Sequence, residues 1–211
     1  MGAFFTNVQV YTGGRPHAAI REGIIGAVRA QAAAAGQAED PSLEDVGDED
    51  DGGRIVLIAP AGSEPWITVY DSATESQADE PLHDLGERLS RIGGAAVTVL
   101  VHDSDILQLR LYRGGAEADH YNSVPDYFED VTDDERAAVA GQADRWAGLL
   151  AEGATPDALQ AAWTTDVVFA EDLLRDVAAL LGWDEERCSV GYRYLMEDEP
   201  DLDGFTRLAF R

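Results

Sequence analysis

The stretch AAVTVLVHDSDILQLRLYRGG, residues 95–115, decides the fold. Valines recur at every second position over 97–101, and leucines do so over 107–111. This alternation is typical of strands with one buried face, and the Asp-Ser pair between the two runs favours a tight turn. The stretch therefore predicts an antiparallel hairpin. The glycine pair at its end turns the chain into a third strand that runs through His120.

The chain before this hairpin predicts the same kinds of element in a repeating order. A strand over 4–11 precedes a helix that begins at Pro16. Two further strands follow, at 55–59 and 66–70, and a second helix begins at Pro81. Strand–helix–strand–strand units in this order predict an α+β fold with an antiparallel-rich sheet and helices on one face. An internal duplication would explain why this order of elements occurs twice, although the turns match only loosely.

The chain after Pro125 has a helical character. Thr132 to Glu135 has capping-box spacing, a helix opens at Thr155-Pro156, and apolar residues at helical spacing run from Phe169 to Gly182. Short strands are expected at 191–196 and 205–210. We therefore expect an α+β sheet domain over residues 1–123 and, packed on it, a mainly helical portion over residues 124–211 that ends in short strands.

The segment from Gln37 to Gly53 interrupts the first unit. It concentrates like charges, with Asp48 to Asp51 all acidic, and has almost no apolar content. Such a segment has little to bury, so we expect residues 37–53 to form an exposed and mobile acidic loop.

Charge is the strongest global property of the chain. Asp and Glu number 41 against 15 basic residues, all of them Arg, which gives a formal net charge of -26. A surface this negative repels nucleic-acid phosphate and anionic lipid, so we expect neither nucleic acid nor membrane as a partner. The charge is explained either by solubility, in a salty cytoplasm or with a high-GC genome, or by binding of a basic partner protein such as a nuclease toxin.

The same charge predicts a response to salt. Raising the ionic strength from roughly 0.01 M to 0.15 M shortens the Debye length from about 30 Å to about 8 Å, which screens repulsion among the carboxylates. We expect the melting temperature to rise over this range in thermal unfolding experiments. A flat or falling melting temperature would mean that pairing within the fold already compensates the charges.

The single cysteine, Cys188, points to a reducing compartment, because one thiol cannot form an internal disulfide. Neighbouring carboxylates raise a thiol pKa, so Cys188 is expected to be structural. The first residues lack the basic and apolar regions of a signal peptide, and we expect a cytoplasmic protein.

Motifs of catalysis, metal binding and cofactor binding are absent from the sequence. The acidic stretches near 48–53 and 199–204 begin like EF-hand loops, but the twelfth position is Ala59 in one and Phe210 in the other. No metal or cofactor is therefore expected. An enzyme would have to use His102 or His120 with neighbouring carboxylates, and at His102 the favoured turn residues alone explain the sequence.

The best candidate for a binding region mixes aromatic, basic and amide side chains, as recognition surfaces do. An alternative is a connector whose aromatics pack the sheet against the helical half. The interpretation we favour is a protein-interaction or immunity-type factor, and the alternative is a small-molecule enzyme. The candidate partner-binding residues are Tyr112, Arg113, His120, Tyr121, Asn122, Asp126, Tyr127 and Phe128.

Overall fold

The computed structural model describes residues 2–46, 52–197 and 202–211. The strands are β1 (Phe5–Tyr11), β2 (Arg54–Ile58), β3 (Trp66–Asp71), β4 (Ala95–His102), β5 (Ile106–Arg113), β6 (Ala116–Asn122) and β7 (Thr206–Phe210). The α-helices are α1 (His17–Ala34), α2 (Asp79–Gly93), α3 (Asp133–Ala138), α4 (Pro156–Trp163), α5 (Ala170–Leu181), α6 (Glu185–Cys188) and α7 (Tyr192–Met196). Two 3₁₀ helices, η1 (Ser72–Thr74) and η2 (Ala143–Leu149), complete the set.

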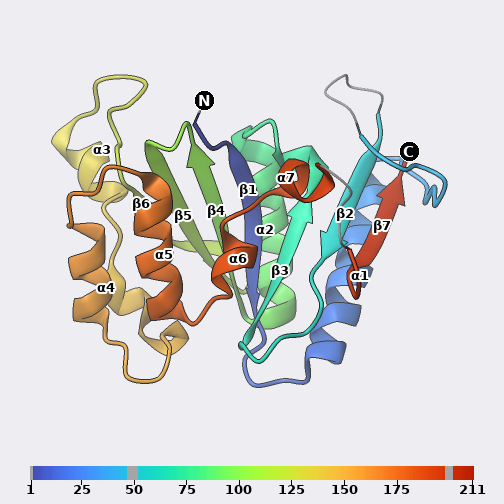
Figure 1. The fold of residues 1–211 in the computed structure, drawn as a ribbon, viewed down its shortest axis with the longest axis horizontal. Coiled ribbons are helices and arrows are strands. Elements are labelled where there is room, and N and C mark those ends of the chain that lie inside the picture. Colours follow the sequence, from blue (N-terminus) through green and yellow to red (C-terminus); the bar gives the residue numbers. More distant parts are fainter. Residues whose placement is uncertain (1, 47–51, 198–201) are drawn as a thin grey trace.

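The strands form one sheet in the order β6-β5-β4-β1-β3-β2-β7, and every neighbouring pair is antiparallel (Figure 1). The predicted α+β class and the antiparallel sheet are confirmed. The hairpin of β4 and β5 pairs over its whole length, from Ala95 opposite Arg113 to His102 opposite Ile106. β7 pairs with β2, so the C-terminal part of the chain supplies an outer strand. The division of the chain near residue 123 remains a prediction.

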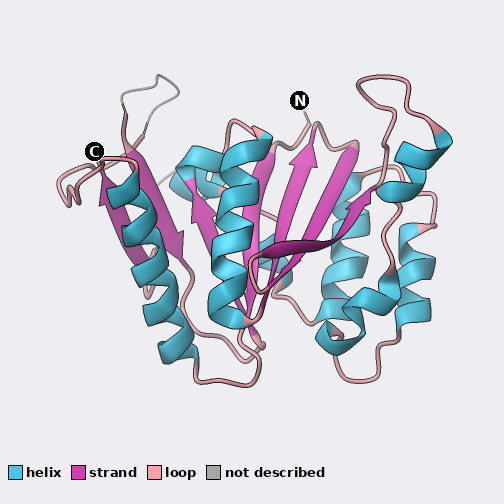
Figure 2. Cartoon of the chain, turned by 180° about the vertical axis from the view of Figure 1, so that it is seen from behind, coloured by secondary structure: helices cyan, strands magenta, loops and turns pink. Residues whose placement is uncertain are grey.

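Helices cover both faces of the sheet (Figure 2). On one face, α1 and α2 bury a core with the sheet that includes Ile24, Val28 and Leu85. On the other face, η2 and α4 to α6 pack on the leucines of β5 around Trp146, whose side chain is fully buried. Side chains of β5 alternate between the two faces of the sheet. Its leucines therefore face η2 and α4 to α6, while Tyr112 and every second residue before it face α2.

Close approach between α2 and the sheet depends on a glycine. A Cβ at Gly86 would lie 2.5 Å from a ring atom of Tyr112 and 2.8 Å from the methyl group of Thr98. The helix ends at Gly93 and is followed by Gly94, whose φ of 88° is the left-handed conformation typical of a helix C-terminus.

A ladder of buried polar side chains joins the sheet to the segment after α6. The Thr68 hydroxyl donates to the Gln9 side chain, which in turn donates to Asn7 at 2.8 Å. Asn7 donates to the main-chain carbonyls of Cys188 and Val190, at 2.8 and 2.9 Å. Each of these polar groups has a partner, so their burial carries no large desolvation penalty.

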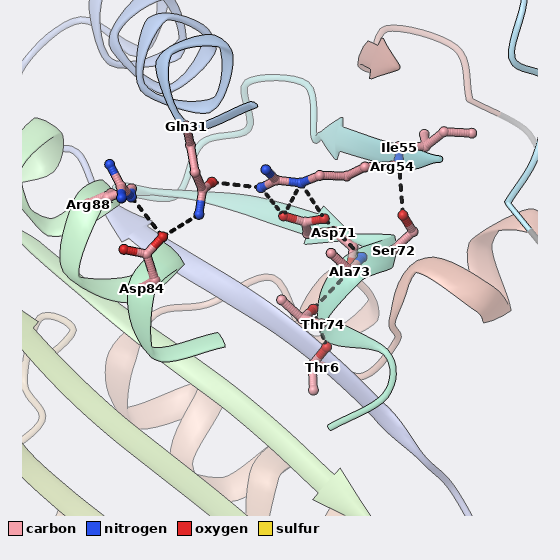
Figure 3. A network of polar contacts seen from close by, with 10 residues as sticks. All are labelled: Thr6, Gln31, Arg54, Ile55, Asp71, Ser72, Ala73, Thr74, Asp84 and Arg88. Carbon is pink, nitrogen blue, oxygen red and sulfur yellow. Dashed lines mark hydrogen bonds and ion pairs between the residues drawn. The ribbon is translucent and has the colours of Figure 1, made fainter. Parts of the chain in front are cut away.

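A second polar network lies between the two helices and the strands β2 and β3 (Figure 3). Arg54 is buried and donates from Nε to both carboxylate oxygens of Asp71, at 3.0 and 3.1 Å. Its guanidinium also donates to Gln31 of α1 at 2.7 Å. The Gln31 amide donates to Asp84 of α2, which pairs with Arg88. The network therefore ties α1 and α2 to the sheet.

Two features differ from the sequence-based expectations. Residues 192–196 form helix α7, not a strand, because Tyr192 is anchored at both ends: its amide donates to Glu75 at 3.1 Å and its hydroxyl to Asp45 at 3.0 Å. The expected strand at 205–210 is confirmed as β7. In the expected acidic loop, Asp48 to Asp51 lie outside the described residues, and the described flank is attached, with Leu43 buried in a small core beside β2.

The attachment of that flank covers one edge of the sheet. Ala38 and Arg211 exchange two main-chain hydrogen bonds, of 2.8 and 2.9 Å, and Asp40 N donates to the carbonyl of Ala209 beside β7. At the opposite edge, the segment after α3 bonds to β6, where Asn122 N donates to the Val139 carbonyl. Part of each outer strand is therefore already paired within the chain.

Candidate functional site

The end of the sheet where β4 turns into β5 carries an exposed cluster of aromatic rings around His102. The rings of Phe4, Tyr127 and Phe128 lie 4.8, 6.1 and 5.1 Å from that of His102, all close to perpendicular to it. Such edge-to-face arrangements are favourable contacts between rings. Phe128 nevertheless stays 70% exposed, so the cluster is only partly covered.

His102 is held in a fixed orientation. Its Nδ1 lies 2.6 Å from the side-chain oxygen of Gln77, so Nδ1 carries the proton in that bond. The Gln77 amide donates to the carbonyl of Val101 at 2.7 Å. In the neutral imidazole this arrangement leaves Nε2 as the acceptor nitrogen.

Backbone strain is concentrated at the same place. Among the described residues, three that are not glycine have positive φ: Gln77 at 58°, Asp103 at 52° and Ser104 at 60°. Asp103 and Ser104 form the hairpin turn, which requires positive φ at both central residues and usually contains glycine. Gln77 holds His102 at the end of the same strand. Strain of this kind clusters at functional sites and therefore singles out this end of the sheet.

Further exposed hydrophobic side chains surround the cluster. Ala170 N donates to the Ser104 carbonyl at 2.7 Å, which brings the exposed Val168 and Phe169 beside the hairpin turn. Tyr194 of α7 is also exposed, and its hydroxyl accepts from Phe4 N at 3.4 Å. We call this surface the aromatic tip; it lies at the end of β4, whose ribbon ends near the N label at the top of Figure 1. It comprises Phe4, His102, Tyr127, Phe128, Val168, Phe169 and Tyr194.

Acidic side chains are interspersed with the aromatic tip. Asp103 and Asp105 of the turn are exposed, as are Glu129 and Asp130 after Phe128. The Tyr127 hydroxyl donates to Asp105 at 3.2 Å. Desolvation, then that hydrogen bond and the charge of Asp105, raise the pKa of Tyr127, so its phenol stays neutral.

The structure distributes the predicted binding residues over three places. Asp126, Tyr127 and Phe128 lie at or beside the aromatic tip, and Asp126 is paired with Arg136. Tyr112, His120 and Asn122 lie on the α2 face of the sheet. Arg113 and Tyr121 lie on the opposite face. The eight residues therefore do not form one surface.

Two of these aromatic residues are part of the core. Tyr112 is fully buried and its hydroxyl lies 3.0 Å from Nδ1 of His83. Tyr121 is 4% exposed and stacks on Trp163, with ring centroids 4.9 Å apart and an interplanar angle of 12°. Tyr121 packs the sheet against the helical portion, as the connector interpretation expects, whereas Tyr112 packs against α2 on the other face. Arg113 is exposed and donates to the carbonyl of Arg145 at 3.0 Å.

The two histidines considered for catalysis lie on different parts of the sheet. His102 is at the tip, whereas His120 lies in β6 opposite Arg110. Burial, and then the charge of Arg110, lower the pKa of His120 to about 4, so it is neutral near pH 7. Within the part of the chain that the structure describes, neither histidine is paired with a carboxylate, and no group of His, Cys, Asp and Glu residues is arranged to hold a metal ion.

Cys188 does not offer a reactive thiol. It is fully buried, and desolvation raises the pKa of its thiol to about 12. Nucleophilic cysteines require a lowered pKa and access to solvent, so the structure agrees with a structural role.

Four residues of the aromatic tip were not identified as binding or catalytic candidates from the sequence: Phe4, Val168, Phe169 and Tyr194. Gln77, which orients His102, was not identified either. Phe169 begins the apolar pattern of a helix, so its spacing indicates a core position. For these missed residues, the only local sign of exposure is the consecutive apolar pair Val168-Phe169 in front of a helix, and this sign is weak.

No helix among residues 2–46, 52–197 and 202–211 combines the length and the apolar character needed to cross a membrane. Comparison of the chain with protein-family models, with curated proteins and with solved structures finds no significant match.

Proposed function

We propose that the protein is an interaction factor that binds a basic partner protein through the aromatic tip. One observation supports this above all. Every large hydrophobic side chain that is exposed in the described part of the chain belongs to this surface: Phe4, Tyr127, Phe128, Val168, Phe169 and Tyr194. Scattered single hydrophobic residues are normal on a protein surface, whereas their confinement to one end supports an interaction site there.

The chemistry of the surface favours a protein partner. Aromatic side chains bury much area at low entropic cost and dominate the energetics of protein interfaces. His102 and Gln77 hold the ring cluster in place before binding, which reduces the ordering that a partner must impose.

The charge around these rings favours a basic partner. Exposed carboxylates at Asp103, Asp105, Glu129 and Asp130 lie between or beside the hydrophobic residues, in a chain of net charge -26. Complementary charges accelerate encounter and reject acidic competitors. An immunity-type factor that neutralises a nuclease toxin fits this description, and the buried, unpaired Cys188 fits a reducing compartment.

The test compares two variants that add the same negative charge. The wild-type protein first captures its partner from the native host, and the purified partner is then titrated against each variant. Phe128→Asp places a charge on the most exposed ring of the cluster, and we expect the dissociation constant to rise at least about 30-fold, as for an aromatic anchor. Ala30→Asp on the exposed face of α1 should change it less than about threefold.

Most of the loss for Phe128→Asp should lie in a faster dissociation rate, because buried anchors hold a complex after it has formed. Circular dichroism verifies that both variants are folded. If the partner binds the folded Phe128→Asp variant and the wild-type protein equally well, the aromatic tip is not the binding surface.

A further inference from the structure

A hollow of about 380 Å³ lies directly beside the aromatic tip. Its lining comes from the N-terminal segment, the β4–β5 turn, the start of α5 and the segment that leads into α7. The lining includes Phe5, Ser104, Glu171, Val190 and Tyr194. Two of these residues also contact the segments of the aromatic tip: the Ser104 carbonyl accepts from Ala170 N, and the Tyr194 hydroxyl accepts from Phe4 N.

Glu171 supplies the one charged group of this lining. Its Oε1 accepts from the Ser104 hydroxyl at 2.7 Å. Its Oε2 is buried and has no hydrogen-bond partner among the described residues. A carboxylate oxygen that is removed from water without a partner is costly, so such an atom in a native structure calls for an explanation.

The position of the Glu171 carboxylate is fixed in advance. Ser104 accepts from Ala3 N at 2.8 Å and therefore directs its own proton to Glu171. The main chain of Ser104 is held as well, since its amide donates to the Ala3 carbonyl and its carbonyl accepts from Ala170 N. The carboxylate is thus oriented by the hairpin turn.

The surroundings suit a planar cation. The nearest arginine along α5, Arg175, is already paired with Asp172 and Glu185. Tyr194, which is exposed, adds aromatic surface to the lining, and its ring packs on the buried Phe5 with the centroids 6.4 Å apart. A guanidinium can donate to a carboxylate and stack on an aromatic ring at the same time, whereas an ammonium is more strongly hydrated and lacks the planar fork.

We infer that this hollow receives an arginine side chain of the partner protein, with its guanidinium donating to the Glu171 carboxylate. The inference rests on the proposed function, since the arginine belongs to the partner that covers the aromatic tip. It assigns the partner a specific feature: an arginine next to the apolar residues that contact the rings.

The first experiment uses a small probe and needs no partner. N-acetyl-arginine amide is titrated into the ¹⁵N-labelled protein, and the amide signals of Ser104, Glu171 and Val190 are followed. We expect them to shift in a saturable way. N-acetyl-citrulline amide has nearly the same shape without the charge, and we expect it to bind at least about tenfold more weakly, because charged hydrogen bonds are stronger than neutral ones.

Two variants locate the binding. Glu171→Gln keeps an acceptor for Ser104 but removes the charge, and it should weaken binding of the arginine probe at least about tenfold. Glu22→Gln removes a charge from an exposed position of α1, outside the aromatic tip, and should leave binding within about twofold, as exposed charges contribute little.

Three results would overturn the inference: equal binding of arginine and citrulline, an unchanged affinity in Glu171→Gln, or signal shifts confined to other residues. Failure of the proposed function is a separate outcome. In that case Phe128→Asp leaves partner binding unchanged, while the arginine probe still binds in a manner that depends on Glu171.

Discussion

Replacement of Arg54 by methionine should lower the free energy of unfolding by about 3–5 kcal/mol, the usual cost of removing one member of a buried ion pair. The side chains of Arg54 and Asp71 are 8% and 1% exposed. Without the guanidinium, the Asp71 carboxylate remains buried with the Ala73 amide as its remaining donor. Gln31 loses the donor to its side-chain oxygen as well, so the link between α1 and the sheet is weakened.

The matched control is Arg29→Met, which breaks the pair of Arg29 with Glu39. These side chains are 54% and 44% exposed, and exposed pairs contribute less than about 1 kcal/mol. Urea denaturation followed by circular dichroism measures both variants. The double variant Arg54→Met with Asp71→Asn should recover part of the loss, because Asn keeps an acceptor for Ala73 but carries no charge. Equal stability of the two single variants would mean that the Arg54 pair is not buried in solution.

Replacement of Trp146 by alanine should lower the free energy of unfolding by about 3–5 kcal/mol, as for other buried tryptophans. Trp146 is fully buried and its ring lies 5.5 Å from that of Trp163. Its Nε1 donates to Asp119 of β6 at 2.7 Å. The substitution removes this packing and also one donor to a buried carboxylate, so it loosens the contact between η2 and the sheet.

Trp146→Phe is the control, because it keeps most of the ring packing and loses the hydrogen bond, at a cost of about 1–3 kcal/mol. Urea denaturation of Trp146→Ala also tests whether the two parts of the chain unfold together. Because residues 124–211 share a core with β4 and β5, a single transition is expected. Two separate transitions would show that the helical portion is an independent domain.

The elements that the sequence predicted correctly are those with local causes. The hairpin of residues 95–113 follows from alternation and from its turn residues, and the capping box at Thr132 is present as expected. The helix opening at Thr155-Pro156 and the stop at Gly182 also agree with the structure. Each of these signals lies within a few residues of the element that it determines.

The elements that were not predicted depend on distant contacts. Residues 191–196 alternate weakly, but Glu75 and Asp45 bind Tyr192 from far away in the sequence and the segment becomes helical. The attachment of residues 38–40 to β7 likewise joins segments that lie far apart in the sequence. Periodicity within a short segment contains no information on such partners.

In the candidate binding region, too, the local sequence did not reveal which single residues are buried. Tyr121 and Tyr127 lie in the same short stretch of sequence, yet Tyr121 stacks on Trp163 while Tyr127 is exposed. Tyr121 lies in β6 opposite Leu109, so the register of β6 places it on the buried face, whereas Tyr127 lies beyond the end of β6. A shift of one residue reverses the face on which a side chain lies, so neither the burial of Tyr121 nor the grouping of Phe4 with Phe128 could be read from composition.

The covered edges of the sheet have a consequence for behaviour in concentrated solution. Strand-by-strand association of neighbouring molecules requires an unpaired edge, and here the segments 38–40 and 139–141 already occupy part of both. Mutual repulsion keeps such acidic molecules apart at low ionic strength, but this protection fades as ions accumulate. The covered edges do not depend on ions, so the protein has a second safeguard against fibrillar aggregation under the conditions in which the first is lost.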